Sequence, residues 1–228
     1  HHLFQPLLYQ VAGAALSGAA LAANALLGVA VTSAMGAGVG AYLTLQHHSA
    51  LSGGAASACN VNETFNCDLI NTSEYSEIAG IPIALIGVAF YLALGLTAWL
   101  GWRDRQGYDR APGLIVAGGV AACGYSAFLA YASTTLGAWC LFCISLYVVN
   151  ALLLVGGLMA SKAAPDGASV SAALQGKNDR SMATALVAGL AFLAVGQLGY
   201  SSLGSAAENA VGGATASGGE ASDEQLAQ

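Results

Sequence analysis

Five cysteines are the residues of this 228-residue chain with the clearest chemical potential, and four of them form two pairs. Cys59 and Cys67 lie eight positions apart, and Cys140 and Cys143 enclose the dipeptide Leu-Phe. A thiolate attacks a disulfide, so two neighbouring pairs can exchange disulfides with each other or with another protein. Four cysteines can also bind zinc, and Cys59 with Cys67 alone fits a plain structural disulfide. The pattern leaves these three chemistries open.

The chain that must position these cysteines is unusually apolar. It is 56% hydrophobic and 8% charged, with a mean hydropathy of +0.64, whereas soluble domains carry about 25% charged residues. Asp, Glu, Lys and Arg are absent from residues 1–62, 78–102, 111–161 and 181–207. Uncharged apolar stretches of about 18 or more residues can cross a bilayer as helices. The composition predicts an all-α membrane protein, and the lack of a basic patch argues against nucleic-acid binding.

Five membrane-spanning helices are the simplest division of this sequence. We place the first at residues 24–46, after an N-terminal helical extension or tag remnant at residues 1–23. The others are expected at residues 81–102, 112–135, 139–160 and 182–203. An outer loop covers residues 47–80, and a second long loop covers residues 161–181. The tail at residues 204–228 is rich in Gly, Ala and Ser, which predicts a flexible segment.

The basic residues predict how the helices are oriented. All six lie in two loops, at Arg103, Arg105 and Arg110 and at Lys162, Lys177 and Arg180. Five spans place both loops on one side, and an excess of Lys and Arg marks the cytoplasmic side. The outer loop with Cys59 and Cys67, and the turn before Cys140, then face the opposite side. Disulfides persist on that side of a bacterial inner membrane, where a zinc site at the lipid interface is unusual, so we expect no metal.

Position along a helix gives the second pair a reason to be reactive. We expect Cys140 in the first turn of the fourth span, with Cys143 on the same face about 4.5 Å deeper, at 1.5 Å per residue. A helix N-terminus carries unpaired N–H groups that favour a thiolate. The deeper sulfur would face the interior of the bundle. Cys123 is expected to be a small buried hydrophobe, and His47 and His48 to mark the end of the first span.

The combination of these features resembles the vitamin K epoxide reductase family, particularly its bacterial members. Two cysteine pairs, Ser73 six residues after Cys67, and Gly80-Ile81-Pro82 at the start of the second span carry the similarity. It covers roughly residues 25–160 and includes Gly87, Phe90-Tyr91, Ile144 and Tyr147. The resemblance implies a four-helix transmembrane bundle around a quinone site, at residues 24–160, plus a fifth transmembrane helix.

The resemblance also implies roles for individual residues. Cys59 and Cys67 would take electrons from a periplasmic thioredoxin-fold (DsbA-like) partner, and Cys67 would exchange with Cys140. Cys143 would then reduce a membrane quinone, ubiquinone or menaquinone. The four paired cysteines are therefore the expected catalytic residues. The expected quinone-binding residues are Cys143, Tyr147, Ser73 and Phe142.

Two other functions stay open at this point. The animal enzymes carry an asparagine in the second span that binds the quinone, and Pro82-Ile83-Ala84-Leu85 offers no such group. This departure favours plain quinone reduction over epoxide reduction in the animal sense. The second alternative is a non-enzymatic membrane module with a structural disulfide. A transporter is disfavoured, because the predicted spans contain none of the acidic or basic residues that mark ion pathways.

Overall fold

Long helices make up most of the molecule. The computed structural model describes the backbone of residues 5–104, 108–163 and 180–226, and the side chains of residues 18–104, 108–163 and 180–204. Within these residues, five helical segments are long and apolar enough to cross a membrane: Gly18–Leu51, Ile83–Arg103, Ala111–Leu136, Leu141–Ala163 and Ser181–Gly204. The protein is therefore an all-α membrane protein, as predicted, and each segment matches one expected span.

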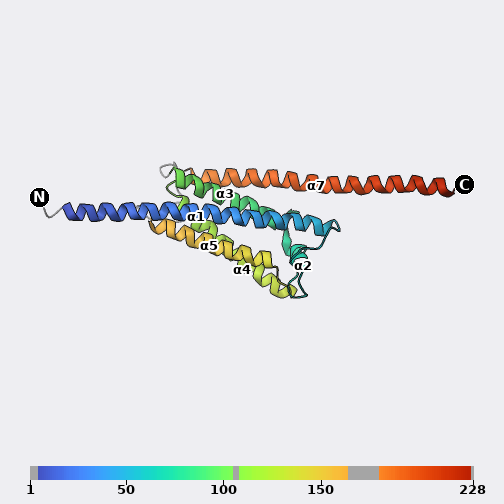
Figure 1. Cartoon of the computed structure of the whole chain (residues 1–228), viewed down its shortest axis with the longest axis horizontal. Coiled ribbons are helices and arrows are strands. Elements are labelled where there is room, and N and C mark those ends of the chain that lie inside the picture. The colour runs from blue at the N-terminus through green and yellow to red at the C-terminus, as the bar shows by residue number, and fades with distance from the viewer. Residues whose placement is uncertain (1–4, 105–107, 164–179, 227–228) are drawn as a thin grey trace.

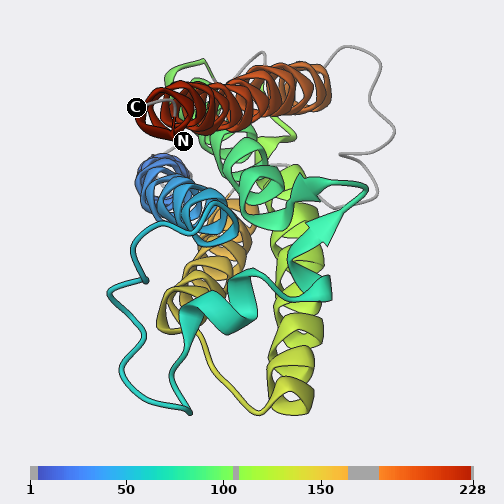
Figure 2. The ribbon, with the colours of Figure 1, turned by 90° about the vertical axis from the view of Figure 1, so that its right-hand side faces the viewer.

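Four of the long helices form a bundle, and the fifth lies against its outside. α1 (Gln5–Leu51) packs on both α3 (Ile83–Arg103) and α5 (Leu141–Ala163). α4 (Ala111–Leu136) packs chiefly on α5. α7 (Ser181–Leu226) contacts α3 and lies along the outside of the bundle, as Figures 1 and 2 show. The arrangement corresponds to the predicted four-helix bundle with an additional helix.

Small residues let the bundle helices approach one another closely. A Cβ added at Gly156 of α5 would lie 2.7 Å from Val29 Cγ2 of α1, so the contact has no room for a side chain. Membrane helices associate through such packing because lipid gives them no hydrophobic driving force. Around these contacts Leu26, Ile115 and Leu153 are fully buried. The core of the bundle therefore combines tight backbone approach with interlocking apolar side chains.

A compact segment between α1 and α3 covers one end of the bundle. It contains α2 (Cys67–Asn71), the short helix η1 (Glu74–Ser76) and a hairpin of β1 (Glu77–Ile78) and β2 (Ile81–Pro82). In the antiparallel hairpin, Glu77 pairs with Pro82 and Ile78 with Ile81. Ala79 and Gly80 both have positive φ, at 53° and 78°, which a two-residue hairpin turn of this type requires. This turn gives the Gly-Ile-Pro sequence its structural role, because it leads directly into α3.

Two expectations about the ends of helices were wrong. α1 continues to Leu51, so the outer loop begins later than residue 47 and His47 lies within the helix. α7 continues as a helix to Leu226, where the sequence predicted a flexible tail. The segment lacks proline and contains many alanines, which are the best helix formers, and these offset its glycines. The second long loop, expected at residues 161–181, begins later than predicted because α5 extends to Ala163. Residues 164–179 of this loop lie outside the described part of the chain.

The basic residues and the cysteine pairs lie at opposite ends of the bundle. Arg103 ends α3, Arg110 precedes α4, Lys162 is in the last turn of α5 and Arg180 precedes α7. Arg105 and Lys177 lie outside the described residues. The α4–α5 turn and the segment with Cys59 and Cys67 are at the other end (Figure 1).

Candidate functional site

A short backbone contact brings the two cysteine pairs together. α4 ends at Gly137, whose φ of 70° turns the chain back toward the outer segment. Phe65 then forms a parallel bridge with Trp139. The Trp139 N–H donates to the Thr64 carbonyl at 2.7 Å, and the Asn66 N–H donates to the Trp139 carbonyl at 3.1 Å. The next residues along the two segments are Cys67 and Cys140, so this contact sets the pairs side by side.

Three of the four paired cysteines share one buried cluster. Cys59 and Cys67 form a disulfide, whereas Cys140 and Cys143 are free thiols. The sulfur atoms of Cys59, Cys67 and Cys140 all lie within 4.8 Å of one another. The three residues are only 4%, 1% and 1% exposed, and they pack with Leu43 of α1. A small movement would bring the Cys140 sulfur into line with the disulfide, so the arrangement suits disulfide exchange.

Cys140 occupies the position directly before α5. Its carbonyl accepts the N–H of Ile144, and its sulfur accepts the backbone N–H of Cys143 at 3.2 Å. The sequence predicted that Cys140 lies inside the first turn of this helix, whereas in the structure the helix begins one residue later, at Leu141. As a helix cap, its sulfur satisfies an N–H group that the helix itself leaves unpaired. The hydrogen bond from the Cys143 side chain, together with backbone N–H groups, lowers the pKa of the Cys140 thiol. Cys140 is thus prepared to act as a thiolate nucleophile.

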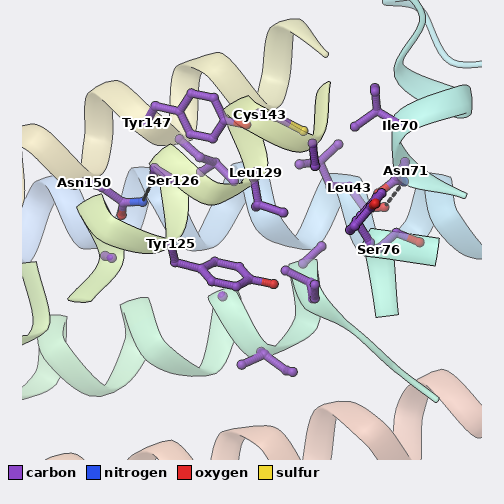
Figure 3. A pocket seen from close by; sticks show the side chains of 18 of the residues that line it. Leu43, Ile70, Asn71, Ser76, Tyr125, Ser126, Leu129, Cys143, Tyr147 and Asn150 are labelled. Atoms are coloured by element: carbon purple, nitrogen blue, oxygen red, sulfur yellow. Dashed lines mark hydrogen bonds between the residues drawn. The ribbon is translucent and has the colours of Figure 1, made fainter. Parts of the chain in front are cut away.

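Cys143 faces an apolar cavity inside the bundle. The cavity has a volume of about 370 Å³ and is lined by α3, α4 and α5, with α2 and η1 at one end. Ligand pockets typically measure about 300–1,000 Å³ and combine apolar walls with a few polar groups. In Figure 3, Asn71 and Ser76 lie toward one end of the cavity, Asn150 and Ser126 lie toward the other, and Cys143 and Tyr147 lie between them. The free thiol therefore has direct access to a space that fits a small apolar ligand.

Of the other three predicted quinone-binding residues, two line the cavity and one does not. Tyr147 lines the cavity one turn after Cys143. Ser73 lines its outer end, and its hydroxyl donates to the Ile70 carbonyl at 2.8 Å, which stabilises the turn after α2. Phe142 is not one of the lining residues; its ring packs on Tyr42, with centroids 4.7 Å apart. Three of the four predicted residues thus share the cavity, and Phe142 contacts α1 beside it.

Several polar residues near the site were missed by sequence reasoning. Asp68 accepts hydrogen bonds from the Ser57 N–H and the Asn60 side chain, which fixes the chain on both sides of Cys59. Asn71 lines the cavity while its amide donates to the Leu43 carbonyl. Asn150 also lines the cavity, and its spacing of seven residues from Cys143 could have identified it, because such residues share a helix face.

His47 was expected at the headgroups, but it is buried against the outer segment. One ring nitrogen contacts the Asn71 carbonyl, and the other contacts the Glu77 carboxylate at 2.8 Å. The side chain therefore connects α1 to both α2 and β1. No sequence signal distinguished it from His48, which is only half-buried.

The fifth cysteine, Cys123, lies apart from the cavity, and the cluster of three cysteines does not suit a metal ion. Cys123 is half-buried in α4 rather than fully buried, and it is not among the residues that line the cavity. The sulfurs of Cys59, Cys67 and Cys140 are close enough for metal binding, but two of them are joined in a disulfide. Zinc binds thiolates, so this oxidised arrangement does not suit the metal.

Together, the helices and the site define a multi-pass membrane protein with a buried redox-type cysteine cluster beside an apolar cavity. The model of the vitamin K epoxide reductase family matches residues 27–157, which include all four paired cysteines and the bundle. The chain belongs to this family and has its oxidoreductase character. No curated protein matches the chain.

Proposed function

We propose that this protein is a thiol–quinone oxidoreductase that carries electrons from a periplasmic thioredoxin-fold partner to a membrane quinone. The observation that carries the proposal is the position of Cys140 and Cys143. The Cys140 sulfur lies within 4.8 Å of both sulfurs of the outer disulfide, and Cys143 lines the apolar cavity. The Cys140–Cys143 pair thus lies between the outer Cys59–Cys67 disulfide and the cavity that a lipid-soluble acceptor would occupy.

The electron path begins at the outer disulfide. A thiolate of the partner attacks Cys59, Cys67 leaves as a thiolate, and the partner's second thiol closes the partner's own disulfide. The released Cys67 thiolate then attacks Cys140 in a Cys140–Cys143 disulfide, and Cys143 leaves as a thiolate. Cys59 next attacks Cys67, which restores the outer disulfide and releases Cys140. The final arrangement has Cys59 bonded to Cys67, with Cys140 and Cys143 free, as in this structure.

The last step returns the inner pair to its oxidised form. Cys140 and Cys143 join as a disulfide and release two electrons and two protons. A bound quinone supplies the acceptor for both, and becomes the hydroquinone. Overall, the partner's dithiol is oxidised and one quinone is reduced, so the atoms and charges balance. The lowered pKa of Cys140 supports the exchange, because a thiol of low pKa leaves readily as a thiolate when Cys59 attacks Cys67.

The cavity suits a quinone head group in chemistry and in size. Its walls are predominantly apolar, with side chains such as Phe90, Leu129 and Leu146. Cys143 and Tyr147 would contact the ring, and Ser73 would support the segment that closes the outer end. Ubiquinone and menaquinone both meet these requirements. We therefore assign the cavity to a membrane quinone of this class.

The proposed orientation rests on the distribution of charge. Arg103, Arg110, Lys162 and Arg180 lie at the end of the bundle opposite the cysteines. An excess of basic residues marks the cytoplasmic side of a membrane. Both cysteine pairs therefore face the opposite side, which is the periplasm for a bacterial inner membrane. A thioredoxin-fold partner would approach Cys59 there. Val61, two residues further along, is 67% exposed and offers that partner an apolar contact.

Replacing single cysteines tests the proposal. Purified protein is given a reduced thioredoxin-fold thiol oxidase as donor and decylubiquinone as acceptor. We expect Cys140→Ala and Cys143→Ala to abolish quinone reduction, whereas Cys123→Ala should retain it. Normal turnover in the first two variants would contradict the proposed path. Parallel assays with dithiothreitol and vitamin K epoxide measure the animal-type activity separately.

A further inference from the structure

The deep end of the cavity holds a polar group of three side chains from three helices. Tyr91 of α3 donates a hydrogen bond to Asn150 Oδ1 of α5 at 2.8 Å. The Asn150 amide in turn donates to Ser126 Oγ of α4 at 2.9 Å. All three residues are at least nine-tenths buried, and all three line the cavity. We call this set the deep polar group.

Two hydrogen-bond donors of the deep polar group have no protein acceptor. Ser126 accepts from Asn150, but its own hydroxyl hydrogen meets no acceptor among the described residues. The Asn150 amide has two N–H groups, and only one of them is used. A buried donor without an acceptor is costly, and the walls around it are apolar side chains such as Phe90 and Leu129. The arrangement is therefore incomplete without a ligand that brings an acceptor atom.

The bond from Tyr91 fixes the orientation of the amide. Because Tyr91 donates to Oδ1, the nitrogen of Asn150 turns toward Ser126. Figure 3 shows that Asn150 and Ser126 lie together at the same end of the cavity. Asn150 lies two helical turns after Cys143, about 10.5 Å along the axis at 1.5 Å per residue. Tyr147 lies between them on the same face of α5. The reactive thiol and the unused donors thus approach the cavity from two separate points.

We propose that Ser126 and Asn150 bind the quinone carbonyl that lies farther from Cys143. This inference rests on the proposed function, because it names the residues that orient the quinone in that reaction. A quinone ring carries two opposite carbonyl oxygens, so one can lie toward the thiol pair while the other accepts from the deep polar group. The two donors then select for a ligand with an acceptor at both ends of its ring.

A purely structural role makes a different prediction. Hydrogen bonds between membrane helices also contribute to the association of those helices. If the deep polar group only joined α3, α4 and α5, its loss would lower stability without changing how a quinone is held. Ser126→Ala separates the two roles well, because it leaves the Tyr91–Asn150 bond in place. Asn150→Leu removes the whole group.

The test measures quinone binding as well as turnover. Full-length protein in detergent is titrated with decylubiquinone that carries a carbon-13 label at one carbonyl or the other, and infrared difference spectra record each carbonyl band. In the unmodified protein we expect one labelled carbonyl to show the downshift of a hydrogen-bonded group at the deep end. Ser126→Ala should weaken that shift and raise the dissociation constant about three- to five-fold, and Asn150→Leu should raise it about ten-fold.

Ser33→Ala is the matched control. Ser33 is also a buried serine whose hydroxyl has no partner, but it is not among the residues that line the cavity. It should change neither the carbonyl bands nor the dissociation constant. If the unmodified protein reduces decylubiquinone but Ser126→Ala and Asn150→Leu leave both carbonyl bands unchanged, the inference about these residues is wrong and the proposed function stands. If the unmodified protein neither binds nor reduces the quinone, both are wrong.

Discussion

The Cys59–Cys67 pair and the Cys140–Cys143 pair lie side by side, yet they are held by different kinds of structure. The outer pair belongs to a segment of short elements, in which single side chains such as Asp68 and His47 make the connections. The inner pair belongs to the start of α5, a helix of 23 residues packed on α1 and α4. One pair therefore depends on hydrogen bonds between short elements, and the other on extensive helix packing.

This difference suits the two tasks. Cys59 is 4% exposed, so a partner protein reaches its sulfur only when the outer segment moves. A segment of short elements whose hydrogen bonds are largely exposed can open locally at low cost in free energy. Cys140 and Cys143 instead need fixed positions, one against the outer disulfide and one against the cavity. In the proposed path, we expect the outer pair to move toward the partner protein while the inner pair keeps its position between the outer disulfide and the cavity.

The largest expected effect concerns which sulfurs meet. In the double variant Cys59→Ala with Cys143→Ala, the remaining Cys67 and Cys140 have lost their own partners and should form a stable disulfide with each other. Non-reducing peptide mapping by mass spectrometry should show this bond in nearly all molecules. Substituting Cys123→Ala in the same background removes the only other free thiol and should not change the result. Absence of a Cys67–Cys140 bond would contradict the proposed adjacency.

A second test releases the outer segment from α1. His47→Ala removes the contacts to Asn71 and Glu77, and we expect the free energy of unfolding to fall by roughly 2–4 kcal/mol, because one bond involves a carboxylate. The thermal midpoint in detergent measures this change. His48→Ala alters the neighbouring histidine, whose ring approaches only Tyr200, and should have a much smaller effect. Equal destabilisation by both substitutions would show that His47 has no special role.

A third test loosens only the chain on either side of Cys59. Asp68→Ala removes the acceptor for the Ser57 N–H and the Asn60 amide, at a cost of about 1–3 kcal/mol in local stability. Hydrogen exchange of the Ser57 amide should accelerate, and dithiothreitol should reduce the outer disulfide faster. Glu63→Ala removes an exposed acid of the same loop and serves as the control. An unchanged exchange rate at Ser57 in the Asp68 variant would argue against this restraint.

The smallest expected effect tests the inner pair. The side chain of Cys143 lowers the pKa of the Cys140 thiol, so Cys143→Ala should raise that pKa, and the thiolate fraction of Cys140 at a given pH should fall. Cys143→Ser keeps a hydrogen-bond donor and should raise it less. Ultraviolet thiolate absorbance is followed against pH with Cys59, Cys67 and Cys123 replaced by alanine. Identical titration curves for the Ala and Ser variants would rule out the proposed hydrogen bond.

The sequence predicted the bundle better than the outer segment. The five spans follow from uncharged apolar runs, a property of local composition that requires no knowledge of long-range contacts. The bridge between Phe65 and Trp139 and the bonds of Asp68 and His47 join residues distant in sequence, and no local pattern encodes them. The Gly, Ala and Ser content of residues 204–228 predicts a flexible tail, whereas the structure has a helix to Leu226, because alanine favours helices and the segment lacks proline.

The candidate site was predictable to a similar extent. Cysteine spacing and family resemblance identified the two pairs, and the helical period placed Tyr147 beside Cys143. Phe142 lies within the same Cys140–Cys143 motif but packs on Tyr42. Its side chain points away from that of Cys143 because adjacent positions of a helix face different directions. Ser126 was missed because it is one of several hydroxyl residues in its span and only the assembled bundle brings it to Asn150, whereas the seven-residue spacing from Cys143 could have identified Asn150.

A single-turnover experiment tests the central claim most directly. Protein with Cys59→Ala and Cys67→Ala is fully reduced, freed of reductant under anaerobic conditions and mixed with excess decylubiquinone. The account predicts that one equivalent of quinone is reduced per protein while Cys140 and Cys143 become a disulfide, and that adding Cys143→Ala abolishes both changes. Quinone left fully oxidised beside persistently free Cys140 and Cys143 thiols would contradict the claim that this pair delivers electrons to the cavity.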